Sequence, residues 1–146
     1  MTEDELLQRY GLHPTGPDLD RVREILRGEV ARERHRLGDG DTELMKLCCV
    51  QLFHHGSLAD VLLIWQAKES GWDPHHSIDV QLLCGAGLDA TKAFLADDSG
   101  GEARKALDYL IECETAGDFG GFTVADQSAW YHRYYRVPLG ASGGDD

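Results

Sequence analysis

Positive charge is scarce in this chain of 146 residues, which has 14 Lys and Arg against 26 Asp and Glu and a formal net charge of −12 at pH 7. Because phosphate binding requires clustered cations, nucleic acid is not an expected partner. Long apolar runs are missing too. None approaches the ~18 residues of a membrane span, so no membrane contact is expected. The N-terminal stretch MTEDELLQRYGL also lacks the basic region and apolar core of a secretory signal. We therefore expect a cytoplasmic protein.

Paired-cysteine motifs and the common catalytic motifs are also missing. The four cysteines are Cys48, Cys49, Cys84 and Cys113, and none stands in a CxxC pair. All four lie in apolar segments, so buried reduced thiols are expected rather than disulfides. No HExxH or P-loop pattern occurs in the chain. These absences lean against an enzyme.

A series of helix signals is what the sequence does contain. Apolar residues recur every three to four positions. The capping-box pattern, a hydroxyl residue with an acidic residue three positions later, occurs at Thr2, Ser57 and Thr123. The segment 42–55 is apolar on nearly every side, which is typical of a central buried helix. The predicted helices span residues 2–11, 18–37, 42–55, 58–69, 77–96 and 102–115, with a last helix after Thr123. The fold expected is all-α, with five to seven helices.

A weak internal repeat connects these helices. The stretch LMKLCCVQL (44–52) aligns with VQLLCGAGL (80–88), and LLIWQAKESG (62–71) aligns with DYLIECETAG (108–117). Two helical hairpins of this length, within 42–117, resemble HEAT-like or armadillo-like repeats, which implies antiparallel hairpins stacked as a short array. The stretches LLCGAGL and IECETAGDF also resemble small bacterial proteins of unknown function, which implies no activity. We expect one helical domain over 1–137 and a flexible tail over 138–146.

The repeat also bears on the stretch VQLLCGAGLDATKAFLA (80–96), which contains Gly85-x-Gly87-x-x-Ala90, the outline of a dinucleotide-binding turn. Such a turn needs a strand before it and further parallel strands after it. The segment 102–115 has helical period, and too few residues remain for the other strands. We therefore expect 80–96 to be one continuous helix. Gly85 and Gly87 would let a neighbouring helix approach closely.

Two histidine pairs, His54-His55 and His75-His76, suggest four nitrogen ligands for a metal ion. The predicted helix 58–69 separates them by roughly 18 Å at 1.5 Å per residue. Adjacent side chains on a helix also diverge by about 100°, so each pair is a poor chelate. No metal and no cofactor is expected.

Recognition is the function that the remaining residues favour. Residues 37–146 hold 7 basic and 18 acidic residues, a surface suited to a cationic partner. We expect an acidic helical module that binds another protein or peptide, in its most specific form an immunity-type inhibitor of a basic protein. The alternative is a small enzyme or metabolite-binding protein with a site near His75, His76 and Asp79, in which His76 and Asp79 are the catalytic candidates. The candidate binding residues are Trp72, His75, His76, Trp130, Tyr131, Tyr134 and Tyr135, and at least one face of the last four must pack against the core.

Overall fold

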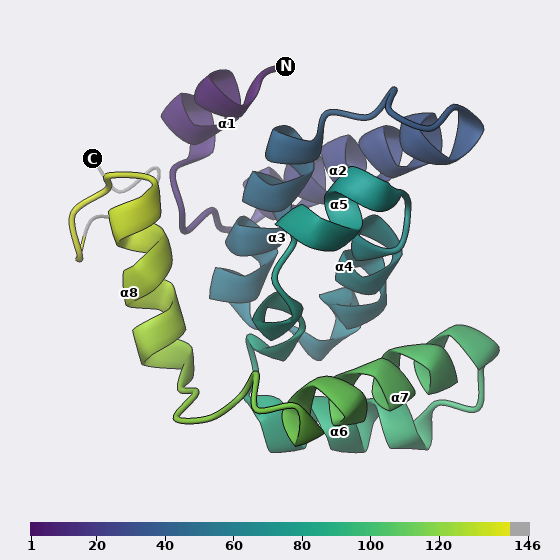
Figure 1. Ribbon diagram of the computed structural model, residues 1–146. Helices are drawn as coiled ribbons and strands as arrows, with labels where there is room; N and C mark the ends of the chain where they lie inside the picture. Colours follow the sequence, from purple (N-terminus) through teal and green to yellow (C-terminus); the bar gives the residue numbers. More distant parts are fainter. Residues whose placement is uncertain (141–146) are drawn as a thin grey trace.

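The computed structural model describes residues 1–140, and this part of the chain is all-α, with eight α-helices, two 3-10 helices and no strand (Figure 1). The elements are α1 (Glu3–Tyr10), α2 (Pro17–His35), α3 (Thr42–His55), η1 (Leu58–Asp60), α4 (Val61–Lys68), α5 (Trp72–Ser77), η2 (Val80–Cys84), α6 (Leu88–Asp97), α7 (Gly101–Thr115) and α8 (Val124–Tyr134). The all-α prediction is confirmed. The number of helices exceeds the expected seven because Trp72–Ser77 forms a separate short helix.

Helix α3 lies at the centre of the fold, as its composition predicts. Every residue from Leu44 to Phe53 except Lys46 is buried. Helices α1, α2, α4, α5 and η2 all pack against it. A helix with no polar face is stable only when it is covered on all sides, and here five elements cover it.

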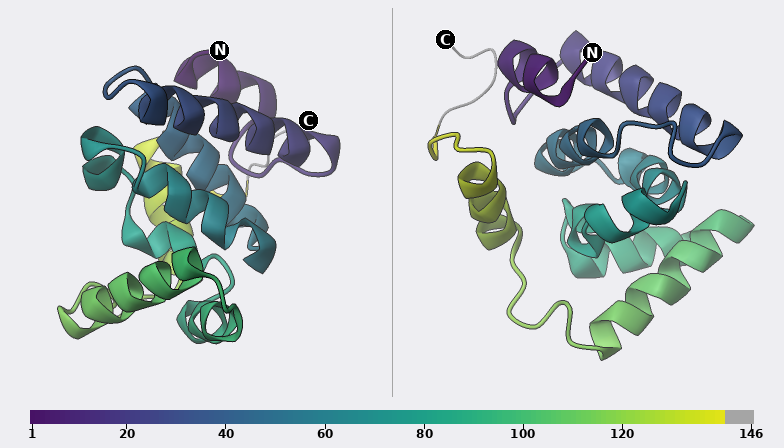
Figure 2. Two further views of the ribbon diagram at one scale, coloured as in Figure 1. Left: turned by 90° about the vertical axis from the view of Figure 1, so that its right-hand side faces the viewer. Right: turned by 45° about the horizontal axis from the view of Figure 1, so that its top comes forward.

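The other helices surround this centre. Figures 1 and 2 show α6 and α7 as an antiparallel pair beneath the body, and α8 along one side of it. Helix α8 reaches the body through large side chains: the Tyr131 ring meets the Phe53 ring edge-on, with the centroids 6.0 Å apart. None of the helices described over residues 1–140 is both long and apolar enough to cross a lipid bilayer.

Local capping signals place several helix ends correctly. Thr2 forms the expected capping box with Glu5, and the Thr123 hydroxyl accepts a hydrogen bond from the amide of Asp126. Helix α3 spans the predicted residues and ends at Gly56 in the left-handed conformation (φ 74°). Helix α2 differs slightly, because Gly16 and Pro17 start it rather than Asp18 and it ends at His35.

The segment predicted as one helix over 58–69 is a 3-10 turn followed by α4. Asp60 does not complete a capping box with Ser57. Its carboxylate instead accepts hydrogen bonds from Nε and Nη2 of Arg23 on α2, at 2.7 and 3.0 Å. A buried carboxylate is most stable beside a matching cation, so the tertiary ion pair takes the place of the local cap.

The prediction of one continuous helix over 77–96 is wrong. Within the range, η2 ends at Cys84 and α6 begins at Leu88. Gly87 lies between them with φ 98°, which L-residues with a side chain rarely adopt. The stretch that the repeat aligns with α3 is therefore a 3-10 turn and a loop. This half of the repeat is shared in sequence pattern but not in conformation, whereas 62–71 and 108–117 lie mostly in α4 and α7.

Gly85 does mark a close approach, as expected, although it is not within a helix. A Cβ atom at this position would lie 2.4 Å from the carbonyl oxygen of Phe53 on α3. Its backbone angles are ordinary (φ −61°, ψ −23°), so contact rather than conformation requires glycine. Gly85 thus allows close packing against α3, and Gly87 provides the positive φ between η2 and α6. Residues 1–140 contain no strand that a dinucleotide turn would follow.

Candidate functional site

The short helix α5 is fixed to α4 by a buried lysine. Lys68, the last residue of α4, donates hydrogen bonds from Nζ to the carbonyl oxygens of His75 and Ile78, at 2.6 and 2.5 Å. These carbonyls lie at the C-terminal end of α5, where a cation is favourable. Burial lowers the pKa of the Lys68 ammonium group. The lysine holds the end of α5 in place beside the end of α4.

This arrangement forms an open pocket, which we call the Trp72 pocket. It has a volume of about 440 Å³ and is lined by Glu69, Gly71, Trp72, His75 and His76. The Trp72 side chain is 70% exposed, and its ring lies 4.1 Å from the ring of His76. The Glu69 carboxylate lies 2.7 Å from Nδ1 of His75. An exposed indole beside a carboxylate is a suitable binding place for a cationic group.

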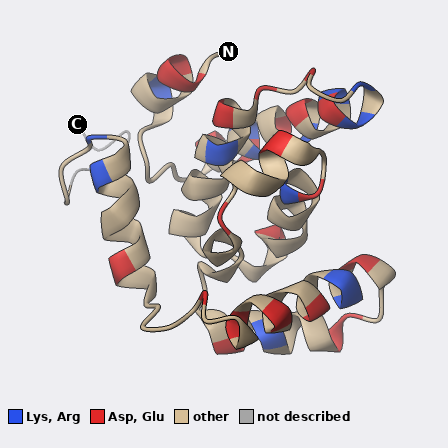
Figure 3. Ribbon diagram, in the orientation of Figure 1, with Lys and Arg blue, Asp and Glu red and all other residues tan. Residues whose placement is uncertain are grey.

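The surroundings of the Trp72 pocket are acidic. Residues 69–126 contain 12 Asp and Glu against 3 Lys and Arg, which gives a sum of −9 within the total of −12. Figure 3 shows acidic residues spread along α6 and α7, with few basic ones. The pocket also borders α7, because the His75 and Tyr109 rings lie 5.8 Å apart.

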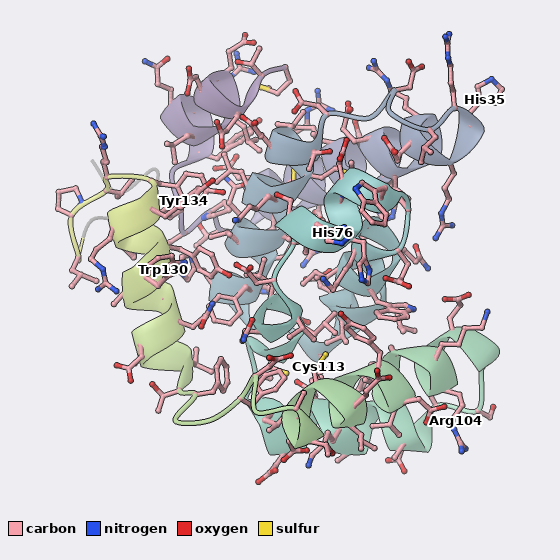
Figure 4. All side chains as sticks on the ribbon, viewed as in Figure 1. His35, His76, Arg104, Cys113, Trp130 and Tyr134 are labelled. Carbon is pink, nitrogen blue, oxygen red and sulfur yellow. The ribbon has the colours of Figure 1, made fainter. Side chains whose placement is uncertain are left out.

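The aromatic residues of α8 divide into a packed pair and an exposed pair. Tyr131 is fully buried and Tyr135 is half-buried, whereas Trp130 and Tyr134 are 50% and 51% exposed. Trp130 and Tyr134 lie on α8, on a different element from His76 of α5 (Figure 4). The Tyr134 ring is covered in part by Nζ of Lys46, 4.5 Å from its centroid. Packing of one face is therefore confirmed.

Asp79 belongs to the packing of α8 rather than to the Trp72 pocket. Its carboxylate accepts a hydrogen bond of 2.6 Å from the Tyr131 hydroxyl and lies 4.0 Å from Nζ of Lys46. Burial, with the nearby Asp79 charge, raises the pKa of Tyr131. His76 has a different partner, since its Nδ1 donates to the carbonyl oxygen of Trp72 at 2.9 Å. The two catalytic candidates thus have separate hydrogen-bond partners.

A second site comes from three histidines on three separate segments. His13 lies in the loop after α1, His54 in the last turn of α3, and His132 on α8. One ring nitrogen of each lies within 4.8 Å of the other two. The His13 and His54 rings are stacked 4.1 Å apart, and Nε2 of His13 lies 2.8 Å from Nε2 of His132. We call this group the three-histidine cluster. It is the group within residues 1–140 whose side chains could hold a metal ion.

Hydrogen bonds to the main chain define the tautomers of two of these rings. Nδ1 of His54 lies 2.8 Å from the carbonyl oxygen of Leu12, and Nδ1 of His132 lies 3.0 Å from that of Val137. A carbonyl oxygen only accepts, so each Nδ1 carries the hydrogen and each Nε2 presents a lone pair. Burial lowers the pKa of His54 to about 4, which keeps the ring neutral near pH 7.

The turn that ends α8 supplies the carbonyl groups for His132. The Val137 amide donates to the His132 carbonyl (2.9 Å), and the Arg136 amide donates to that of Arg133 (3.2 Å), which is the Schellman pattern. Arg136 occupies the left-handed position, with φ 57°, where glycine is usual. The turn brings the Val137 and Pro138 carbonyl oxygens to Nδ1 of His132.

Sequence reasoning missed the three-histidine cluster. His13 and His132 are 119 residues apart, and no spacing rule connects positions so distant. His54 was considered only with His55, which the structure leaves exposed. Of the residues expected to bind a partner, Trp72, His75 and His76 do come together in the Trp72 pocket.

The fold and these sites define a small all-helical protein. No protein-family model matches the chain, and no curated protein and no solved structure matches it significantly.

Proposed function

We propose that this protein binds another protein by accepting an exposed arginine or lysine side chain in the Trp72 pocket. The observation that carries the proposal is an open pocket lined by both the exposed Trp72 indole and Glu69. A cation over an indole ring is attracted by the π-electrons, and a carboxylate adds an ion pair. The negative sum over residues 69–126 would steer a basic partner toward this face.

The rigid base of the pocket supports this proposal. The Lys68 hydrogen bonds hold the end of α5 against α4, so His75 and His76 stand on an anchored helix. A site whose side chains are already in position loses less conformational entropy on binding. The short HEAT-like array expected from the sequence is part of the proposal as the scaffold, with α3 and α4 as one helix pair and α6 and α7 as the other. We also propose that the protein is cytoplasmic, as expected from the sequence. Its most specific form is an immunity-type inhibitor of a basic protein.

The test uses a defined cationic probe. Tetra-arginine and its neutral counterpart tetra-citrulline are titrated into the isotope-labelled protein, and the indole signal of Trp72 is followed by NMR. We expect the arginine peptide alone to shift the Trp72 and His75 signals. Removal of the indole in Trp72→Ala should weaken binding by roughly 2–30-fold, from ~0.5–2 kcal/mol for a cation–π contact.

Leu37→Ala is the matched control, because Leu37 is 70% exposed like Trp72 but lies beyond the end of α2. This variant should bind tetra-arginine as the unchanged protein does. Affinity should also fall as salt is raised. Equal effects of the two substitutions, or affinity that does not change with salt, would refute the proposal.

A further inference from the structure

We propose that His13, His54 and His132 bind a divalent first-row transition metal ion through their Nε2 atoms. The three rings come from a loop and two helices, and one nitrogen of each lies within 4.8 Å of the others. His132 is buried, and the other two rings are partly exposed. An ion can therefore enter from solvent and still be held by a ligand that belongs to the core.

The hydrogen bonds around the rings match those of metal ligands. A histidine ligand usually donates its other ring N–H to a carbonyl or carboxylate, which orients the ring and makes the free nitrogen more basic. His54 does this toward Leu12, and His132 does it toward Val137. His13 is the third ligand, because its Nε2 already faces Nε2 of His132 at 2.8 Å.

The metal-free spacing of the His13–His132 pair is close to what an ion requires, whereas the stacked His13 and His54 rings must rotate before both lone pairs can meet one ion. Zn²⁺ binds imidazole nitrogen at about 2.0–2.1 Å in tetrahedral geometry, which places two ligand nitrogens about 3.3 Å apart. The His13–His132 pair needs to open by about half an ångström to reach that spacing. The hydrogen that Nε2 of His13 now donates to Nε2 of His132 would move to Nδ1 of His13 when the ion enters, so the ring stays neutral.

The ligand set indicates the class of ion. Three neutral imidazoles with no carboxylate suit Zn²⁺, Cu²⁺ or Ni²⁺. Mg²⁺ and Ca²⁺ require oxygen ligands, which this cluster lacks. Three protein ligands leave a fourth position. The Ser128 hydroxyl donates a hydrogen bond of 2.9 Å to Nε2 of His54, and this bond would be replaced by the bond to the ion.

An ion at this site would connect three parts of the chain. The loop after α1, the last turn of α3 and the last turn of α8 would share one centre. Helix α8 is otherwise attached through side chains such as Tyr131, which bonds to Asp79. Metal binding should therefore stabilise the position of α8 in particular.

The test uses untagged, chelator-treated protein titrated with ZnCl₂ and, separately, MgCl₂ by calorimetry. We expect one Zn²⁺ per chain, no Mg²⁺ binding, and a thermal midpoint that rises with Zn²⁺ concentration. His13→Ala and His54→Ala should each weaken Zn²⁺ binding by more than the roughly 10–100-fold that loss of an outer hydrogen-bond partner causes. Circular dichroism of both variants checks that they keep their helices.

Two controls separate this site from other histidines. His55→Ala removes the exposed neighbour of His54 and should leave Zn²⁺ affinity unchanged. The double variant His75→Ala/His76→Ala removes the pair in the Trp72 pocket and should also retain binding. Long-range ¹⁵N–¹H spectra should show metal-induced shifts at Nε2 of the three cluster histidines. Zn²⁺ binding that survives His13→Ala and His54→Ala, or that disappears only in the double variant, would overturn the proposal.

Discussion

Replacing Gly85 by alanine should destabilise the protein more than the same change at any exposed glycine. The new Cβ would lie 2.4 Å from the Phe53 carbonyl oxygen and 3.1 Å from its Cα. These are backbone atoms of the central helix α3, so no side chain can rotate away. Relief requires η2 and α3 to separate by about 1 Å to regain ordinary contact, and overpacking of this kind costs about 1–3 kcal/mol. We expect the upper end of that range.

Two other glycines serve as controls for different causes. Gly87→Ala meets no atom within 4 Å but places a side chain at φ 98° and ψ 156°, a region essentially restricted to glycine, so backbone strain of about 1–3 kcal/mol is expected. Gly28 lies exposed in the interior of α2 with nothing within 4 Å. Gly28→Ala should stabilise the protein by about 0.5–1 kcal/mol, because alanine is the better helix former.

Urea unfolding followed by far-UV circular dichroism measures all three changes in the free energy of unfolding. From the most to the least stable, the expected order is Gly28→Ala, the unchanged protein, Gly87→Ala and then Gly85→Ala. At about 4 °C per kcal/mol for a chain of this size, Gly85→Ala should lower the thermal midpoint by roughly 10 °C. A Gly85→Ala variant as stable as the unchanged protein would refute the close contact between η2 and α3.

Two further predictions concern charge. Arg23→Ala leaves the buried Asp60 carboxylate without its bidentate partner and should cost about 3–5 kcal/mol in urea unfolding, with much of the loss recovered in Arg23→Ala/Asp60→Ala. A loss below about 1 kcal/mol would contradict a strong buried pair. Alkaline pH should also destabilise the protein, because burial raises the pKa of Cys84 from 9.0 to about 12 and that of Tyr109 from 10.0 to about 12. The folded state holds these protons more tightly, so this stabilisation is complete below pH 9 and is lost as pH rises toward 12. Thermal midpoints measured from pH 8 to 12 should fall. A midpoint that does not change over this range would contradict the predicted loss of stability at alkaline pH.

The parts of the fold that follow from sequence are those determined by local signals. Helix α3 was predicted with its observed bounds, because its apolar run is continuous and Gly56 stops it. Helix α7 was predicted from residue 102, one residue after its observed start at Gly101. In both cases the apolar periodicity and the residues that bound the helix lie within the same stretch of chain.

The errors occur where distant residues decide the local structure. The range 77–96 has helical composition, but Gly85 packs against the Phe53 carbonyl of α3, and Gly87 has φ 98°, outside the helical region. Asp60 likewise bonds to Arg23 on α2 rather than to its own helix start. Neither partner is visible from the neighbouring sequence.

The candidate sites also divide into residues that the local sequence predicts and residues that only the fold brings together. Trp72, His75 and His76 lie within two turns of one another in sequence, so local reasoning found them. Glu69 joins them only because the chain turns between α4 and α5. The three-histidine cluster needs contacts across 119 residues, and only the folded chain brings its members together.

The turn at the end of α8 has a consequence for the order in which the three-histidine cluster forms. The groups that hold Nδ1 of His132 all lie within residues 132–138, and a helix with its terminal turn forms in about a microsecond or less. His132 can thus have its ring orientation and tautomer before any long-range contact exists. His54 gains its own only when the loop after α1 meets α3, because its Nδ1 bonds to the Leu12 carbonyl oxygen. During folding, α8 would therefore pack against the loop after α1 and against α3 with its His132 ring already oriented, and this contact would complete the three-histidine cluster.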